Sequence, residues 1–184
     1  MPGRLVVSLV AAALLSSGMW ADVSVAPLRE YELKAGFLYN VLKFVSWPDA
    51  APAVPVLTIA VVAPAPIPEF ATTISGRIVK GRTLTVGMHD DAATAGDAAV
   101  VFVTADAAGQ LPRVLKEVEG RPVLTVAEEG ADGSAQAIIA LAIAETKLTF
   151  DVNLDAAQRA RLQLDSNLLA LARKVRGGRG TGAR

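Results

Sequence analysis

Apolar positions follow their clearest pattern near the start of the chain, in residues 30–48, which read EYELKAGFLYNVLKFVSWP. One apolar row recurs every three or four residues, as on one face of an α-helix, at Tyr31, Ala35, Leu38, Leu42 and Val45. A second row lies beside it, at Leu33, Phe37, Val41 and Phe44. The two rows predict a helix that is largely buried against a flat surface.

The polar positions of this helix form a narrow strip that we expect to be exposed: Glu30, Glu32, Lys34, Asn40 and Lys43. Pro48 disfavours helical geometry in the residue before it and has no backbone N–H to donate. The helix is therefore predicted to end at Ser46-Trp47-Pro48.

Shorter patterns follow. Three runs are almost continuously apolar, as in parallel strands covered on both faces by helices: residues 56–62, 98–104 and 122–127. Residues 83–88 alternate as a strand does. Residues 67–74 predict a short helix, and residues 107–119 predict a longer one with Asp106 as its N-cap.

The last third of the chain predicts an antiparallel hairpin from residues 137–143 and 147–152. Asn153 suits the N-cap of a short helix over 154–160, and residues 161–165 alternate as a short strand. Ser166 is the expected cap of a final helix over 167–175. Together the elements predict an α/β domain over residues 28–175, with a mostly parallel central sheet flanked by helices and a late antiparallel hairpin.

Both ends of the chain differ from this domain. Residues 1–21 have a positive start at Arg4 and an apolar run of 11 residues, which predicts a secretory signal peptide cleaved after Ala21 or Ala26. An uncleaved membrane anchor is the alternative. Residues 176–184 are Gly-rich and basic, and we expect them to be a disordered tail. Outside the cytoplasm, ATP and NAD(P)H are unexpected cofactors, and no nucleotide-binding glycine motif is present.

Composition narrows the chemistry. The chain has no Cys and one His, which excludes thiol nucleophiles, disulfides, iron–sulfur clusters and cysteine-based zinc sites. Residues 22–165 carry 12 basic and 18 acidic side chains, and residues 166–184 carry five basic ones and no acidic one. A mildly acidic body is not typical of a nucleic-acid-binding protein.

No catalytic set can be assembled from the sequence, so we predict no enzyme, cofactor or metal. The polar residues Asp90 and Asp91 beside His89 predict that it lies in a surface loop and is not a base or metal ligand. Glu128, Glu129 and Asp132 could bind a cation at the end of a strand, but a solvated acidic loop is favoured. Ser134 lacks the G-x-S-x-G pattern of a hydrolase nucleophile.

Three segments carry a family resemblance. AGFLYNVLKFVSWP resembles the opening helix of the YfiR family, and AIIALAIAETKLTFDVN and LQLDSNLLALA resemble its closing segments, so the likeness spans residues 30–175. It implies a small periplasmic regulator that binds, and in the best-known case represses, the periplasmic part of an inner-membrane signalling protein. That partner would be a diguanylate cyclase or a histidine kinase, with effects on cyclic-di-GMP and biofilm adhesion.

The resemblance also implies an outer-membrane lipoprotein as a second partner and a homodimer. This chain departs from the family in two ways. It lacks the cysteine pairs that many members carry, which excludes redox sensing through a disulfide, and prolines replace a glycine turn near Pro64.

The candidate partner-binding residues are those that combine apolar bodies with polar or charged tips: Tyr39, Asn40, Lys43, Trp47 and Arg77. Arg77 belongs to a basic turn with Lys80 and Arg82, which could meet an acidic partner. The competing interpretation is core packing for the aromatic residues and simple solvation for the charged ones. The alternative function is a periplasmic small-molecule-binding protein with an apolar crevice at the strand ends, beside Trp47.

Overall fold

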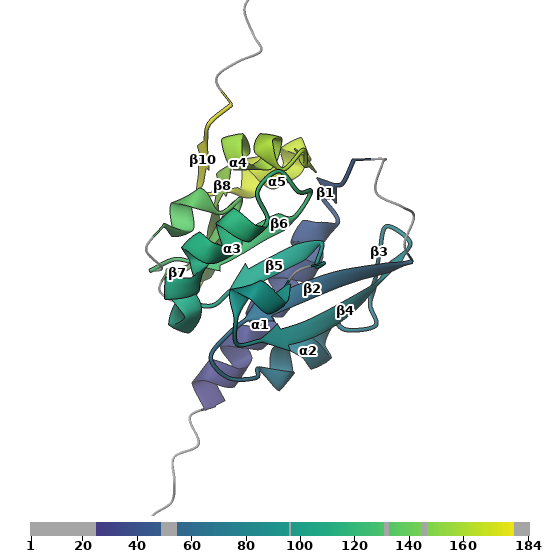
Figure 1. Cartoon of the computed structure of the whole chain (residues 1–184), viewed down its shortest axis with the longest axis vertical. Coiled ribbons are helices and arrows are strands. Elements are labelled where there is room, and N and C mark those ends of the chain that lie inside the picture. The colour runs from purple at the N-terminus through teal and green to yellow at the C-terminus, as the bar shows by residue number, and fades with distance from the viewer. Residues whose placement is uncertain (1–24, 49–54, 96, 131–132, 145–146, 179–184) are drawn as a thin grey trace, which may run out of the picture.

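The structure is a computed structural model that describes residues 25–48, 55–95, 97–130, 133–144 and 147–178. The predicted signal peptide and the end of the predicted tail lie outside the described residues. The central feature of the fold is an eight-stranded sheet in the order β10-β8-β7-β6-β5-β2-β4-β3 (Figure 1). The strands are β2 (Val56–Val62), β3 (Ile78–Val79), β4 (Arg82–His89), β5 (Val100–Val103), β6 (Leu124–Glu128), β7 (Ile139–Ala144), β8 (Lys147–Asn153) and β10 (Lys174–Arg176).

Most neighbouring strands in this sheet are parallel. Strands β4, β2, β5, β6 and β7 form a parallel block, in which Val61 pairs with both Met88 and Phe102. Two antiparallel pairs flank it, β3 with β4 on one side and β7 with β8 on the other. Residues 147–152 indeed form a hairpin with residues 139–144, so both the mostly parallel sheet and the late hairpin are confirmed.

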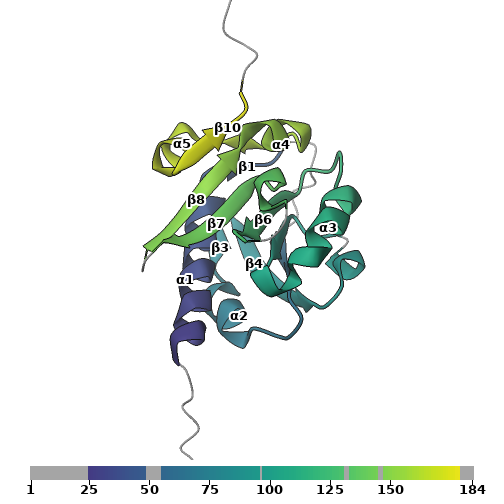
Figure 2. The ribbon, with the colours of Figure 1, turned by 90° about the vertical axis from the view of Figure 1, so that its left-hand side faces the viewer.

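Helices cover both faces of the sheet, and α1 and α3 lie on opposite sides of it (Figure 2). Helices α1 (Val25–Leu42) and α2 (Pro68–Ile74) pack on large side chains such as Ile59 and Phe102. Helix α3 (Leu111–Glu117) and the 3₁₀ segments η1 (Ala92–Ala95) and η2 (Ala105–Gln110) pack on Ala60, Val62 and Val101. The alternation along each strand explains why these runs are apolar throughout.

The opening helix begins and ends earlier than the sequence pattern predicts, since α1 starts at Val25 rather than at Glu30. It ends at Leu42, and Val45–Ser46 forms strand β1, which pairs with β9 (Gln163–Leu164) in a small separate sheet. The apolar spacing that includes Val45 predicted the wrong C-terminal end for this helix. Residues 45–46 leave the helix because they pair as a strand with residues 163–164, far along the chain. Val45 is still fully buried.

The helix predicted over residues 107–119 divides into η2 and α3, and Pro112 stands in the first turn of α3. Proline is well tolerated there because that N–H has no helical partner. Asp106, the predicted N-cap of this helix, lies inside η2, which Thr104 precedes.

The end of the chain also departs from the prediction. Asn153 does cap helix α4 (Leu154–Arg159), with its Oδ1 accepting from the Ala156 N–H at 3.0 Å. Helix α5 (Ser166–Leu171) is capped by Asp165 rather than Ser166 and ends at Leu171, not at residue 175. Lys174–Arg176 instead forms β10, which adds to the free edge of β8 in parallel.

Candidate functional site

Tyr39 is the centre of a surface cluster at the end of α1. Its ring has the Lys43 ammonium 4.3 Å from its centroid and the Arg77 guanidinium carbon 5.0 Å from it. Cations at these distances are attracted by the electron-rich face of an aromatic ring. Asn40 fixes Lys43 further, because its Oδ1 accepts a 2.8 Å hydrogen bond from the Lys43 ammonium. Four of the five predicted partner-binding residues therefore lie together.

A tight turn brings the basic side chains to this helix end. Strands β3 and β4 are joined by Lys80 and Gly81, and both residues have positive φ, at 49° and 77°. Two-residue hairpin loops of this kind match the twist of the strands they join. The Lys80 ammonium donates to the Val45 carbonyl at 2.8 Å and to Ser46 Oγ at 2.9 Å, so the turn is fastened to β1.

Trp47, the fifth predicted residue, lies against Arg82, the residue that follows the Lys80-Gly81 turn. The Arg82 guanidinium carbon lies 6.0 Å from the Trp47 ring centroid, while its Nη2 donates to the Val56 carbonyl at 3.0 Å. The Trp47 side chain is half-buried, and its Nε1 has no hydrogen-bond partner among the described residues. We call this group the aromatic–cationic surface: Tyr39, Asn40, Lys43, Trp47, Arg77, Lys80 and Arg82.

Three of the cations on this surface carry charge that no ion pair within the described residues neutralises. Among the described residues, Lys43, Arg77 and Lys80 form no ion pair, and all three side chains are exposed. They contact rings, a carbonyl, a hydroxyl and an amide, which hold them in place without cancelling their charge. A pre-ordered positive surface on a mildly acidic body is suited to an acidic partner.

A second polar group lies buried at the middle of α1, where the sequence predicted an exposed strip. Lys34 is only 4% exposed, and its ammonium pairs with Glu30 and lies 2.9 Å from Glu128 Oε1. Glu128, 6% exposed, also accepts from the Ala105 N–H at 3.1 Å. The prediction that Glu128 is solvated is therefore wrong. Its carboxylate is the buried counter-ion of Lys34, which allows α1 to pack a lysine against the sheet.

Tyr31 belongs to this buried group, with the Lys34 ammonium 4.6 Å from its ring centroid. Burial, aided by the negative charges of Glu128, Asp106 and Glu30, raises the pKa of the Tyr31 phenol to about 12. No pattern in the sequence indicates this network, because a lysine on a helix is usually exposed.

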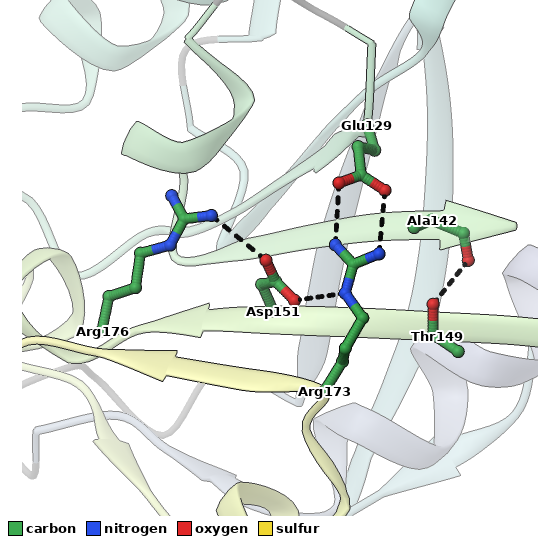
Figure 3. Close-up of polar contacts among 6 residues, drawn as sticks. All are labelled: Glu129, Ala142, Thr149, Asp151, Arg173 and Arg176. Carbon is green, nitrogen blue, oxygen red and sulfur yellow. Dashed lines mark hydrogen bonds and ion pairs between the residues drawn. The ribbon is translucent and has the colours of Figure 1, made fainter. Parts of the chain in front are cut away.

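A third polar group holds β10 on the sheet, and Figure 3 shows two arginines converging on one carboxylate. Asp151 accepts from Arg173 at 2.8 Å and from Arg176 at 3.2 Å (Figure 3). Arg173 also forms two bonds with Glu129, at 2.7 and 3.2 Å. The hydrogen bond from Arg173, with the positive charges around it, holds the pKa of Asp151 below its usual range despite burial. Glu129 is thus an ion-pair partner rather than a simply solvated residue.

The remaining sequence candidates are separate. Asp91 pairs with Arg113 at 3.0 Å and caps the turn after β4, and Ser134 opens the short 3₁₀ segment η3 (Ser134–Gln136). In the part of the chain that the structure describes, no three His, Cys, Asp or Glu side chains are placed to hold a metal ion. Asp132 lies outside the described residues.

A sequence profile described as YfiR/HmsC-like matches residues 31–173 of the 184. The chain belongs to the YfiR/HmsC-like family. This family is periplasmic and regulatory rather than catalytic, and it acts with membrane signalling proteins in cyclic-di-GMP signalling. Of the helices in the described residues, none has the length and apolar character needed to cross a membrane.

Two solved structures share the fold of this YfiR/HmsC-like protein at low identity. The first, from Streptococcus pneumonia, is an "ABC domain in complex with L-Trp", with a TM-score of 0.54 and 11% identity over 79% of this chain and 60% of that one. The second is a conserved domain protein from Vibrio cholerae, with a TM-score of 0.50 and 12% identity at the same coverage. This chain spans about 60% of the length of each structure, and the likeness concerns the fold alone.

Proposed function

We propose that this protein is exported by a cleaved signal peptide and represses the periplasmic sensor part of an inner-membrane diguanylate cyclase or histidine kinase. The contact is made by the aromatic–cationic surface. The observation that carries the proposal is the arrangement of Tyr39 between Lys43 and Arg77, at 4.3 and 5.0 Å. Family membership supplies the class of partner, and the geometry supplies the surface.

The physical features of this surface favour protein binding over simple solvation. Aromatic and arginine side chains contribute much of the binding energy in many interfaces. Aromatic rings in particular cover large areas at a low cost in side-chain entropy. Here the rings and the β3–β4 turn already order the cations, so less freedom is lost on association. An acidic or carbonyl-rich segment of the partner would fit the uncancelled charge and the unpartnered Trp47 Nε1.

Repression follows from linkage. If the protein binds the inactive conformation of its partner more tightly than the active one, binding shifts the partner toward the inactive state by that difference in affinity. Release would then raise cyclic-di-GMP and favour adhesion. The chain has no cysteine, so a disulfide cannot control this release.

The test uses a strain that lacks the chromosomal gene and expresses the full chain or a variant at matched periplasmic level. We expect deletion to raise cellular cyclic-di-GMP and the natural chain to lower it again. Arg77→Glu and Lys43→Glu should each fail to restore repression, because they place a negative charge where an acidic partner docks.

Lys147→Glu is the matched control, since Lys147 is an exposed cation at the start of β8, outside the surface. It should restore repression fully. Restoration by Arg77→Glu and Lys43→Glu to the level of the control would overturn the assignment of the surface. Unchanged cyclic-di-GMP on deletion would overturn the proposed function itself.

A further inference from the structure

A groove on the α3 side of the sheet is not explained by partner binding. It has a volume of about 330 Å³ and lies between the end of α3 and helix α4, over the start of β6 and the residue before β7. That volume is within the range of small-molecule sites, roughly 300–1,000 Å³. None of its lining residues belongs to the aromatic–cationic surface, and the crevice predicted beside Trp47 is a different place.

The floor of the groove is apolar. It is made by side chains from the sheet and from both helical segments: Leu115, Val118, Val123, Ile138, Ala156 and Ala160. Val123, Ile138 and Ala156 are buried, and the others are half-buried. Small side chains at and just after α4 leave the space open, because Ala156 and Ala160 stand where longer residues would fill it. An apolar ligand chain of a few carbons would displace water from this floor, which lowers the free energy of the complex.

One hydrogen-bond donor in the groove is uncommitted. Thr125 is 4% exposed, and its Oγ1 accepts from the Ile138 N–H at 3.0 Å. Within the described residues the Thr125 hydroxyl donates to no acceptor, although a hydroxyl can both accept and donate. A buried donor without an acceptor costs free energy, so a ligand oxygen at this point would be favoured.

The rim of the groove carries charged side chains that form no ion pair with one another or with other described residues. Lys116, Glu119 and Arg159 line the groove, and none of the three forms an ion pair or side-chain hydrogen bond among the described residues. Two cations face one carboxylate, so the rim carries one excess positive charge. That excess matches a ligand with a single negative charge.

We propose that this groove binds a small amphipathic monocarboxylate. The carboxylate accepts from the Thr125 hydroxyl and pairs with Lys116 or Arg159, while its apolar chain lies on the floor between α3 and α4. The groove is separate from the aromatic–cationic surface, since the two share no residue.

The probe for the test is octanoate, titrated into the full secreted chain by isothermal calorimetry. Octylammonium, with the same chain length and the opposite charge, is the ligand control. We expect saturable octanoate binding and at least tenfold weaker binding of octylammonium. Lys116→Gln and Arg159→Gln should each weaken octanoate binding about two- to fivefold, as removal of an exposed charge does.

Arg113→Gln is the matched protein control, because Arg113 lies on the same helix but pairs with Asp91 outside the groove. It should leave the dissociation constant unchanged. Thr125→Val should weaken binding, and Thr125→Ser should restore it, which separates loss of the hydroxyl from loss of the fold. Absence of octanoate binding, equal binding of octylammonium, or dissociation constants that the groove variants do not change would each overturn the proposal.

Discussion

The Lys34 ammonium lies 2.9 Å from the Glu128 carboxylate, and both side chains are more than nine-tenths buried. This contact joins the middle of α1 to the carboxyl end of β6. The aromatic–cationic surface stands on the last turns of the same helix, around Tyr39. A buried ion pair that fixes the position of α1 on the sheet therefore also fixes where that surface is presented.

Lys34→Met is expected to lower the free energy of unfolding by about 3–5 kcal/mol, because it leaves the buried Glu128 carboxylate without its counter-ion. Urea denaturation at pH 7 measures this directly. Glu32→Gln, an exposed change on the same helix, should stay within about 0.5 kcal/mol of the natural chain.

The double variant Lys34→Met/Glu128→Gln should recover most of the lost stability. It removes both buried charges but keeps an oxygen that can accept from the Ala105 N–H. If Lys34→Met alone unfolds at the same urea concentration as the natural chain, the ion pair does not hold α1 in place.

Asp151→Asn is expected to make the free energy of unfolding depend less on pH below pH 7. The pKa of Asp151 is lowered in the fold by Arg173 and Arg176, so its ionised form stabilises the native state above the usual value of 3.8. This contribution is lost as the pH falls through the lower, folded-state pKa. Asp151→Asn should therefore be clearly less stable than the natural chain at pH 7, and the gap should narrow toward pH 2.

Urea midpoints across this pH range provide the measurement, with Asp97→Asn as the control. Asp97 is fully exposed and lies 3.7 Å from Arg121, so its loss should have little effect at any pH. A gap between Asp151→Asn and the natural chain that stays constant down to pH 2 would contradict the linkage.

The sequence predicted the layered fold well because its signals are local. Continuous apolar runs such as Val56–Val62 require cover on both faces, and Asn153 caps its helix with its own side chain. The errors have a common physical origin in distant partners. Residues 45–46 become a strand because residues 163–164 pair with them, and residues 174–176 become a strand because Asp151 binds both arginines beside them.

The candidate surface was predictable in its residues but not in its geometry. Tyr39, Asn40 and Lys43 share one helical turn, which the spacing reveals. The approach of Arg77 depends on the left-handed Lys80-Gly81 turn, and a lysine is an unusual residue for that conformation. Lys34 was misjudged because its counter-ion, Glu128, lies 94 residues further along the chain.

Tyr31 provides a spectroscopic test of the buried network. Burial raises the pKa of its phenol from 10.0 to about 12, so the folded state keeps the proton more firmly than the unfolded chain does. Stability from this group is full below pH 10 and is lost as the pH rises toward 12. The ultraviolet titration difference between the natural chain and Tyr31→Phe should have its midpoint near 12, and a midpoint near 10 would show that Tyr31 is solvated.

Asn153 makes two side-chain hydrogen bonds at the junction of β8 and α4. Its Oδ1 accepts from the Ala156 N–H at 3.0 Å, and its Nδ2 donates to the Ala135 carbonyl at 2.8 Å. Asn153→Ala removes both and should cost about 1–2 kcal/mol in the free energy of unfolding. Asn153→Ser keeps an oxygen at the N-cap and loses only the bond to Ala135, so it should cost less than half as much.

Thermal denaturation of the two variants separates these contributions. If the serine variant melts as low as the alanine variant, the bond to Ala135 rather than the cap holds this junction. Because α4 also forms one wall of the groove through Ala156 and Arg159, the alanine variant should weaken octanoate binding as well. The serine variant, with the helix start intact, should bind octanoate as the natural chain does.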